Sequence, residues 1–324
     1  MIIVTGGAGF IGSAIVWRLN QLGYDKIFIV DHLGENDKWK NLNGLNYIDI
    51  FHKDEFYDLF VNNEFQFDVD TIFHMGACSS TTEKDADYLL YNNFKYTQDL
   101  AKYALKNNAR FIYASSAATY GGGEAGYSDD ENGIEQLRPL NMYGYSKQLF
   151  DLWAKKEGLL NKIVGLKYFN VYGPNEYHKG DMRSVVHKAF GQIMETGKVK
   201  LFKSYRDDYK NGEQLRDFIY IKDAVEMSIF FMENKDKNGL FNIGTGIARS
   251  WNDLVTALFN SLNKTVNIEY IEMPEYLKPK YQYFTQADLT KLKQAGYKKE
   301  ITALENGVED YVNNYLVENK TLAW

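Results

Sequence analysis

Short apolar runs alternate with amphipathic stretches through the first half of the chain. The runs expected to form strands are Ile2–Thr5, Lys26–Val30, Leu45–Asp49, Thr71–His74, Phe111–Ser115 and Ile163–Phe169. Between them lie stretches of helical periodicity, such as Ser13–Leu22 and Thr97–Lys106. This alternation predicts an α/β fold, a Rossmann-type doubly wound parallel sheet with crossover helices.

The pattern changes after Phe169, where long polar connections begin. A later apolar run, Leu240–Ile243, is followed by Gly244-Thr245-Gly246 and is typical of a strand that returns to the first sheet. Because 324 residues exceed the usual size of one domain, we expect two. The Rossmann domain would comprise residues 1–170 and 215–247, and a smaller α/β domain residues 171–214 and 248–324.

Composition and charge exclude several classes of protein. Hydrophobic residues make up 45% of the chain and charged residues 25%, as in ordinary globular proteins. A net charge of −6 argues against nucleic acid or a membrane surface as a partner. With Cys78 as its one cysteine, the chain forms no internal disulfide and no multi-cysteine metal site. We see no signal-peptide pattern and no apolar run of the roughly 18 residues that a membrane span needs, so we expect a cytoplasmic protein without a metal.

A glycine-rich segment, Thr5-Gly6-Gly7-Ala8-Gly9-Phe10-Ile11-Gly12, follows the first strand and opens the first helix. Gly6, Gly9 and Gly12 allow a sharp turn in which main-chain N–H groups and the helix N-terminus face a pyrophosphate. Asp31, which ends the second strand, is typical of a group that binds the adenosine ribose and favours NAD. His32, Lys38 and Lys53 could instead offset the charge of a 2′-phosphate. The residues alone therefore leave NAD and NADP open.

Tyr143 and Lys147 are four residues apart, and this spacing places them on one face of a helix. A phenol is a poor base at neutral pH, but a nearby ammonium group stabilises the phenolate. Ser116 ends an expected strand, at the sheet edge where ligands bind. The three side chains predict an acid–base centre beside the dinucleotide.

The glycine turn, Ser116 and the Tyr143/Lys147 pair resemble the extended short-chain dehydrogenase/reductase superfamily. Spaced signatures narrow this resemblance to the ADP-L-glycero-D-manno-heptose 6-epimerase family: MIIVTGGAGFIGS, GACSSTT, YASSAATYGG, NMYGYSK, YFNVYGP, HKG and YQYFTQADL. The resemblance implies NADP-dependent inversion of C6″ in ADP-D-glycero-β-D-manno-heptose, through a 6″-keto intermediate, for lipopolysaccharide core biosynthesis. It also implies a homo-oligomer, with a pentamer as one candidate.

The resemblance implies roles for further residues. Besides the glycines, the cofactor site would include Phe10, Ile11, Asp31, His32, Lys38, Lys53, Met75, Gly76, Ala77, Cys78, Ser79, Asn92, Lys147, Val171 and Lys179. Lys179 would also be the second acid/base beside Tyr143, although the residues alone favour a solvated loop lysine. Substrate contacts would include Ser116, Asn170, Asp181, Lys188, Phe202, Lys203, Ser204, Tyr205, Arg216 and Tyr281. Of these, Arg216 suits a diphosphate best; a salt bridge with Asp217 or Glu213 is the ordinary alternative.

The chain departs from the family pattern at Met75, Asp181, Lys188 and residues 203–205, and its 204–215 segment is longer. Two other functions stay open: a nucleotide-sugar 4-epimerase, which has no use for Lys179, and a non-catalytic NADP-binding regulator, which has no need of Tyr143 and Lys147. A 4,6-dehydratase is disfavoured, because Ala117 and Ala118 follow Ser116 where that reaction needs an acid.

Overall fold

The computed structural model describes residues 1–275, 277–278 and 281–324. Its central feature is a seven-stranded sheet in which all neighbouring strands are parallel. In spatial order the strands are β10 (Gly239–Ile243), β6 (Val164–Tyr168), β5 (Arg110–Ser116), β4 (Thr71–His74), β1 (Ile2–Thr5), β2 (Ile27–Asp31) and β3 (Asp49–His52). The strand order reverses between β1 and β4, and ligands bind at the carboxyl ends of strands at such a point. The predicted Rossmann-type fold is confirmed.

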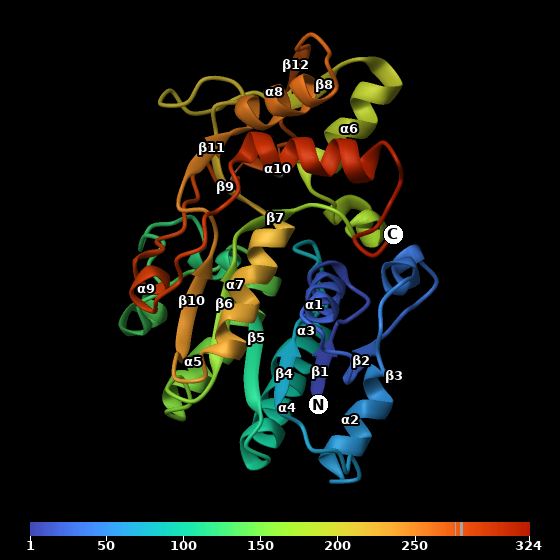
Figure 1. Ribbon diagram of the computed structural model, residues 1–324. Coiled ribbons are helices and arrows are strands. Elements are labelled where there is room, and N and C mark those ends of the chain that lie inside the picture. Colours follow the sequence, from blue (N-terminus) through green and yellow to red (C-terminus); the bar gives the residue numbers. More distant parts are fainter. Residues whose placement is uncertain (276, 279–280) are drawn as a thin grey trace.

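Helices cover both faces of this sheet (Figure 1). On one face α1 (Phe10–Gln21) packs against α7 (Ile221–Glu233). On the other face lie α4 (Tyr96–Lys106), which packs on α2 (Lys53–Val61), and α5 (Met142–Lys156), which packs on α3 (Ala86–Leu89). Because both faces are covered, β1 and β2 are buried along their whole length, and this explains why the sequence shows them as continuous apolar runs.

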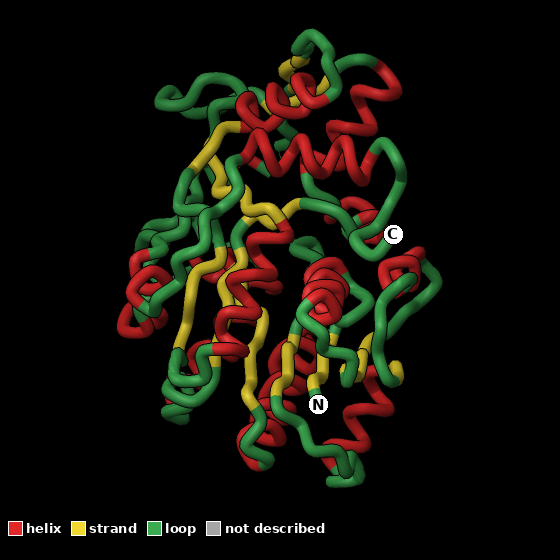
Figure 2. Tube along the Cα trace, in the orientation of Figure 1, coloured by secondary structure: helices red, strands yellow, loops and turns green. Residues whose placement is uncertain are grey.

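A smaller region lies beyond the carboxyl ends of the large sheet (Figure 1). In one of its sheets β9 (Leu215–Tyr220) lies between β7 (Asn170–Tyr172), which is parallel to it, and β11 (Ala248–Ser250), which is antiparallel. In the other, β8 (Val199–Phe202) pairs in parallel with β12 (Ile268–Ile271). The accompanying helices are α6 (Val185–Thr196), α8 (Trp251–Ser261) and α10 (Leu304–Tyr311), whereas α9 (Thr290–Gln294) packs near β10. Figure 2 shows that several loops and strands, not one linker, join this region to the large sheet.

One expected strand is wrong, and the others are confirmed to within one residue at each end. The third strand lies at Asp49–His52 instead of Leu45–Asp49. Gly44 has a φ of +79°, and the Leu45 N–H donates to the carbonyl of Leu42, so the backbone before Asp49 forms a turn. β9 pairs outside the seven-stranded sheet, although we expected residues 215–247 in the Rossmann domain. The domain boundaries stay a prediction.

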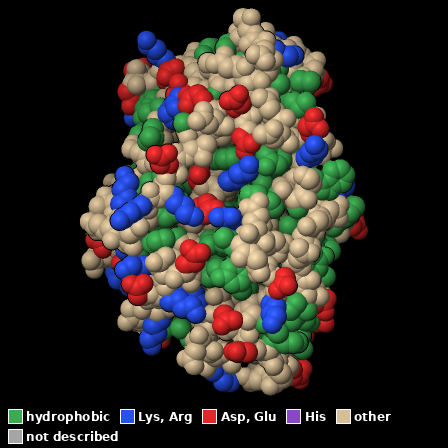
Figure 3. Space-filling model, in the orientation of Figure 1, with side chains coloured by type: hydrophobic (Ala, Val, Ile, Leu, Met, Phe, Trp, Pro, Cys, Tyr) green, Lys and Arg blue, Asp and Glu red, His purple; other side chains and the backbone are tan. Residues whose placement is uncertain are grey.

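The surface carries charges of both signs. On the face that Figure 3 presents, Lys and Arg side chains lie among Asp and Glu side chains. Within the part of the chain that the structure describes, no helix is both long enough and apolar enough to cross a bilayer. The same described residues include no group of three or more His, Cys, Asp or Glu side chains that could hold a metal ion.

Candidate active site

The glycine turn between β1 and α1 depends on close backbone packing. Gly6 has a φ of +63°, and a Cβ added there would lie 2.7 Å from the backbone nitrogen of Gly76 in the loop after β4. A Cβ on Gly12 would lie 2.1 Å from the carbonyl oxygen of Gly6. These two positions therefore require glycine. No side chain caps the N-terminus of α1, and its first turn contains no acidic residue, so its N–H groups suit a phosphate.

This turn forms one wall of a cleft of about 670 Å³ between the large sheet and the smaller region. A second pocket continues from it over Asp31 and the loop at Gly76–Cys78. Each cofactor residue expected from the sequence lines either the cleft or this second pocket. The cleft is lined by Gly6, Gly9, Phe10, Ile11, Gly12, Asp31, Lys38, Met75, Gly76, Ala77, Cys78, Ser79, Lys147, Val171 and Lys179. His32, Lys53 and Asn92 line the second pocket.

Asp31 lies at the carboxyl end of β2 and is almost fully buried. One carboxylate oxygen accepts from the Ala8 N–H at 2.8 Å. The other accepts from the His32 N–H at 2.7 Å and from the Lys38 ammonium at 2.8 Å. Lys53 pairs at 2.6 Å with exposed Asp54. The Asp31 carboxylate, which would repel a 2′-phosphate, is thus already paired with Lys38.

Ser116, Tyr143 and Lys147 meet in the cleft where β5 ends and α5 begins. The Asn141 side chain caps α5 by accepting from the Gly144 N–H at 2.8 Å. Burial raises the pKa of Tyr143, and its hydrogen bond with Ser116 acts in the opposite direction. Burial lowers the pKa of Lys147 to about 8, against the opposing effect of the Asp151 carboxylate. The phenol and its neighbouring ammonium are therefore both desolvated.

Lys179 reaches the cleft from a separate element, the 3-10 helix Tyr177–Met182. Its ammonium nitrogen lies 4.9 Å from the ring centroid of Phe10 in the glycine turn. Burial lowers the pKa of Lys179, while the fully buried Glu176 carboxylate raises it and Lys188 lowers it. A lysine in such surroundings can exchange a proton more readily than a solvated one.

The residues expected to contact substrate are more scattered. Ser116 and Asn170 line the cleft, whereas Asp181 and Lys188 are exposed. Tyr281 lies beside the ring of Phe202, at 6.5 Å between centroids. At the start of the longer 204–215 segment, Tyr205 and the preceding Lys203 both bind Glu272, and the Ser204 N–H donates to Asn211.

Arg216 is buried between two aromatic rings. Its guanidinium carbon lies 5.6 Å from the ring centroid of Trp251, which lines the cleft, and 5.4 Å from that of Tyr281. Its hydrogen bonds go to the backbone carbonyls of Leu215 and Gln282. No carboxylate among the described residues pairs with Arg216, because Asp217 accepts backbone N–H groups at residues 245, 246 and 287 and Glu213 binds Asn252.

Asn93 is a residue of the site that sequence reasoning missed. Its side-chain oxygen accepts from the Cys78 N–H at 2.8 Å, and its side-chain nitrogen donates to the Cys78 carbonyl at 2.9 Å. The same nitrogen donates at 3.0 Å to Ser146, whose hydroxyl donates to the Tyr143 carbonyl at 2.7 Å. Asn93 thus fixes the loop after β4 against α5. An asparagine beside Asn92, outside the elements expected from the sequence, gave no signal of this contact.

Comparisons with known proteins identify the family. Residues 2–244 match the NAD dependent epimerase/dehydratase family. Over 316 residues the chain is 56% identical to an ADP-L-glycero-D-manno-heptose-6-epimerase of Nitratidesulfovibrio vulgaris, with 98% of each chain covered. The chain belongs to the ADP-L-glycero-D-manno-heptose-6-epimerase family.

Solved structures of epimerases share this fold. The chain superposes on the epimerase of this family from Helicobacter pylori with a TM-score of 0.82 and 31% identity, covering 97% of this chain and 95% of that one. It also resembles a UDP-glucuronic acid 4-epimerase from Bacillus cereus, solved with UDP-glucuronic acid and NAD, with a TM-score of 0.78 and 25% identity over 98% and 99% of the two chains. The cofactor of this epimerase-family chain is therefore a nicotinamide dinucleotide.

Replacing Asn93 by alanine should loosen the cleft. The Cys78 N–H and carbonyl would lose buried partners, so we expect Asn93→Ala to lower the free energy of unfolding by about 1–3 kcal/mol and to weaken cofactor binding. Thermal denaturation and fluorescence titration with the dinucleotide measure the two effects, with exposed Asn314→Ala as the control. Unchanged cofactor affinity in a destabilised variant would reject the positioning role.

Proposed function

We propose that the protein inverts C6″ of ADP-D-glycero-β-D-manno-heptose and yields the L-glycero epimer, with NADP as its cofactor. The observation that carries this proposal is the placement of two separate acid–base groups, Tyr143 on α5 and Lys179 on the 3-10 helix, in the wall of one cleft. Membership in the heptose epimerase family supplies the substrate.

The cleft suits the dinucleotide. Gly6 and Gly12 allow the tight backbone packing of the turn, and α1 presents uncapped N–H groups to a pyrophosphate. Asp31 with Lys38 lies at the carboxyl end of β2 for the adenosine ribose. When bound, the nicotinamide would supply reversible hydride transfer at C6″. Lys147, whose ammonium donates to the Ala114 carbonyl at 2.8 Å, would hold the nicotinamide ribose.

Two proton-handling groups suit inversion at an exocyclic carbon. After oxidation at C6″ the ketone turns about a single bond and presents its other face, so its oxygen changes position while the sugar ring does not. Each position needs its own proton partner. Tyr143, hydrogen-bonded to Ser116, would serve one, and Lys179 beside the Phe10 ring would serve the other.

Arg216 is our candidate for the substrate diphosphate. Its guanidinium is held in place by Trp251 and Tyr281 and lacks a carboxylate partner among the described residues. A buried arginine without a counter-ion favours an anionic ligand. Burial lowers the pKa of Arg216, and a diphosphate would compensate for this desolvation.

The surroundings of Asp31 support NADP over NAD. In an NAD site, a free aspartate accepts from the ribose hydroxyls and repels a 2′-phosphate. Here the Lys38 ammonium lies 2.8 Å from the Asp31 carboxylate, and Lys53 and His32 line the same pocket. His52 lies next to them, with its Nε2 3.0 Å from Nδ1 of His32. This basic cluster favours the additional phosphate.

The reaction is tested by NMR analysis of the product formed from ADP-D-glycero-D-manno-heptose. We expect the wild-type protein to form the L-glycero epimer, and Tyr143→Phe and Lys179→Met each to slow this conversion by about 10²–10⁴-fold, because each removes one proton partner. Tyr145→Phe, an exposed position two residues along α5, is the control and should keep normal activity. Turnover of UDP-glucose without turnover of the heptose would favour a 4-epimerase and contradict the proposal.

The cofactor preference is tested by substitution of the two lysines. The combined Lys38→Ala and Lys53→Ala variant should weaken NADP binding by about tenfold or more and NAD binding much less, because only NADP carries the 2′-phosphate. Calorimetric titrations at one ionic strength measure both affinities. Lys40→Ala, in the same 3-10 helix as Lys38 but exposed and paired with Asp37, is the matched control. Equal weakening of both cofactors would argue against NADP selectivity.

A further inference from the structure

A completely buried ion pair lies directly beneath the acid–base centre. Asp151 and Lys167 have no exposed side-chain surface, and the Lys167 ammonium lies 2.7 Å from the Asp151 carboxylate. Neither residue touches the cleft, and the proposed reaction uses neither. Burying two charges is costly unless the site has a use for them or satisfies them fully.

The Asp151 carboxylate joins three elements. One oxygen accepts from the Tyr113 hydroxyl at 2.8 Å. The other accepts from the Ser115 hydroxyl at 2.8 Å and from Lys167. Ser115 and Lys167 are register partners on β5 and β6, so their side chains leave the same face of the sheet, where α5 packs. Lys167 also donates to Thr119 at 2.8 Å.

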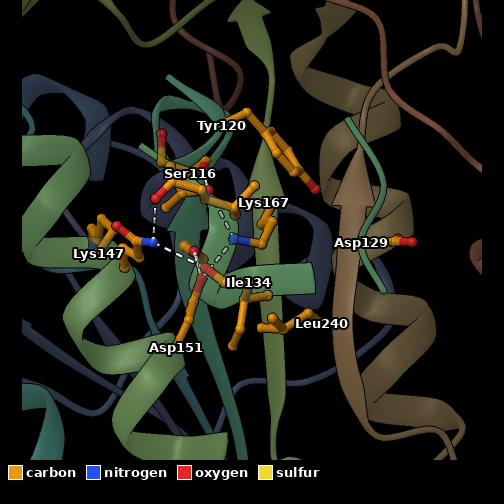
Figure 4. Close-up of polar contacts among 12 residues, drawn as sticks. Ser116, Tyr120, Asp129, Ile134, Lys147, Asp151, Lys167 and Leu240 are labelled. Carbon is orange, nitrogen blue, oxygen red and sulfur yellow. Dashed lines mark hydrogen bonds and ion pairs between the residues drawn. The ribbon is translucent and has the colours of Figure 1, made fainter. Parts of the chain in front are cut away.

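Asp151 also follows Lys147 by one helical turn on α5, and Tyr143 precedes Lys147 by another. Residues four apart on a helix lie on one face, so Tyr143, Lys147 and Asp151 form a single row. Figure 4 shows Lys147 and Lys167 approaching the Asp151 carboxylate from opposite sides. The carboxylate pairs directly with Lys167 at 2.7 Å, whereas the Lys147 ammonium, one turn away on α5, donates to the Ala114 carbonyl at 2.8 Å.

We propose that Asp151 and Lys167 are positioning residues that set the charge of Lys147, with Asp151 keeping it cationic and Lys167 limiting that effect. This inference rests on the proposed function only in giving Lys147 and Tyr143 their catalytic roles. The Lys147 ammonium then stabilises the phenolate of Tyr143 over the working pH range. The pair also fixes the distance between β5, which carries Ser116, and α5, which carries Tyr143.

Other ionisable groups lie around Lys147. His74 on β4 lies near it, but burial lowers the pKa of this histidine to about 3, so the ring is neutral. Burial raises the pKa of the Cys78 thiol in the loop after β4. Burial and Asp151 raise the pKa of Tyr113 on β5, and burial raises that of Tyr143. At neutral pH these four groups are uncharged, so among the described residues facing Lys147 the Asp151 carboxylate is the anion.

The structure predicts opposite effects of two substitutions on the pKa of Lys147, which burial lowers to about 8 in the native protein. Asp151→Asn removes the anion and should lower this pKa further, by about one unit, which is a tenfold fall in the ratio of ammonium to amine. Lys167→Met removes the competing cation, leaves the Asp151 carboxylate to Lys147 alone, and should raise the pKa. In the double variant both charges are absent, and the pKa should lie between those of Asp151→Asn and the native protein.

NMR of protein labelled at the lysine Cε positions measures this ionisation directly, with Lys147→Arg to assign the signal. The titration is done on the full chain without cofactor or substrate. Lys222→Met is the control, because it breaks another lysine–aspartate–tyrosine cluster, that of Lys222, Asp310 and Tyr220, which is partly exposed and lies elsewhere in the fold, and it should leave the pKa of Lys147 unchanged. Where turnover is measurable, the alkaline limb of its pH–rate profile should move to lower pH in Asp151→Asn and to higher pH in Lys167→Met.

Shifts of opposite sign in the pKa of Lys147 support the inference. If the pair were merely structural, Asp151→Asn and Lys167→Met would leave this pKa unchanged or would shift it in the same direction. Either of those two results would overturn it. If Asp151→Asn does not fold, the test uses Lys167→Met and the double variant. Lys167→Met must raise the pKa of Lys147, and the double variant must lower it. Because no sugar is present, opposite shifts in a protein that does not epimerise ADP-heptose would reject the proposed function and leave this inference standing.

Discussion

The docking of α5 on the carboxyl ends of β5 and β6 is the constraint on which the proposed active site depends. Ser116 belongs to the strand, Tyr143 and Lys147 belong to the helix, and their meeting requires both elements to be fixed. The Asp151 carboxylate supplies that fixation by binding Tyr113, Ser115 and Lys167 at the interface. Breaking a buried ion pair by removing one partner typically costs about 3–5 kcal/mol, so this junction tolerates little change.

A buried carboxylate also lies near the second lysine of the cleft, Lys179. Lys179 follows the buried Glu176 by three residues, and the Glu176 carboxylate accepts from the hydroxyl and the N–H of Ser184, which caps α6. Each element that carries a proposed acid–base residue thus has a lysine near the cleft and a buried carboxylate one turn away. Desolvation lowers the pKa of each lysine, and the carboxylate opposes it. In both elements the carboxylate therefore favours the ammonium form that burial disfavours.

Local patterns in the sequence predicted the features that depend on neighbouring residues. The glycine turn, the strand end at Ser116 and the helical row of Tyr143 and Lys147 follow from spacing alone, and the structure brings them into one cleft. Asn93 and the Asp151–Lys167 pair were missed because their partners are distant in sequence and depend on strand order and register. The third strand was misplaced because the turn at Gly44 occupies residues that look strand-like. Scattered positions such as Asp181 and Lys188 carry no local pattern.

In the proposed reaction one sugar carbon is oxidised and reduced within a single cleft, with a separate proton partner for each direction. Substrate carrying deuterium at C6″ tests it most directly. We expect NMR of the L-glycero product to find the deuterium still on C6″, because the same hydrogen is returned to the carbon from which it was taken. Loss of the label to water would rule out hydride return and would indicate removal of that hydrogen as a proton.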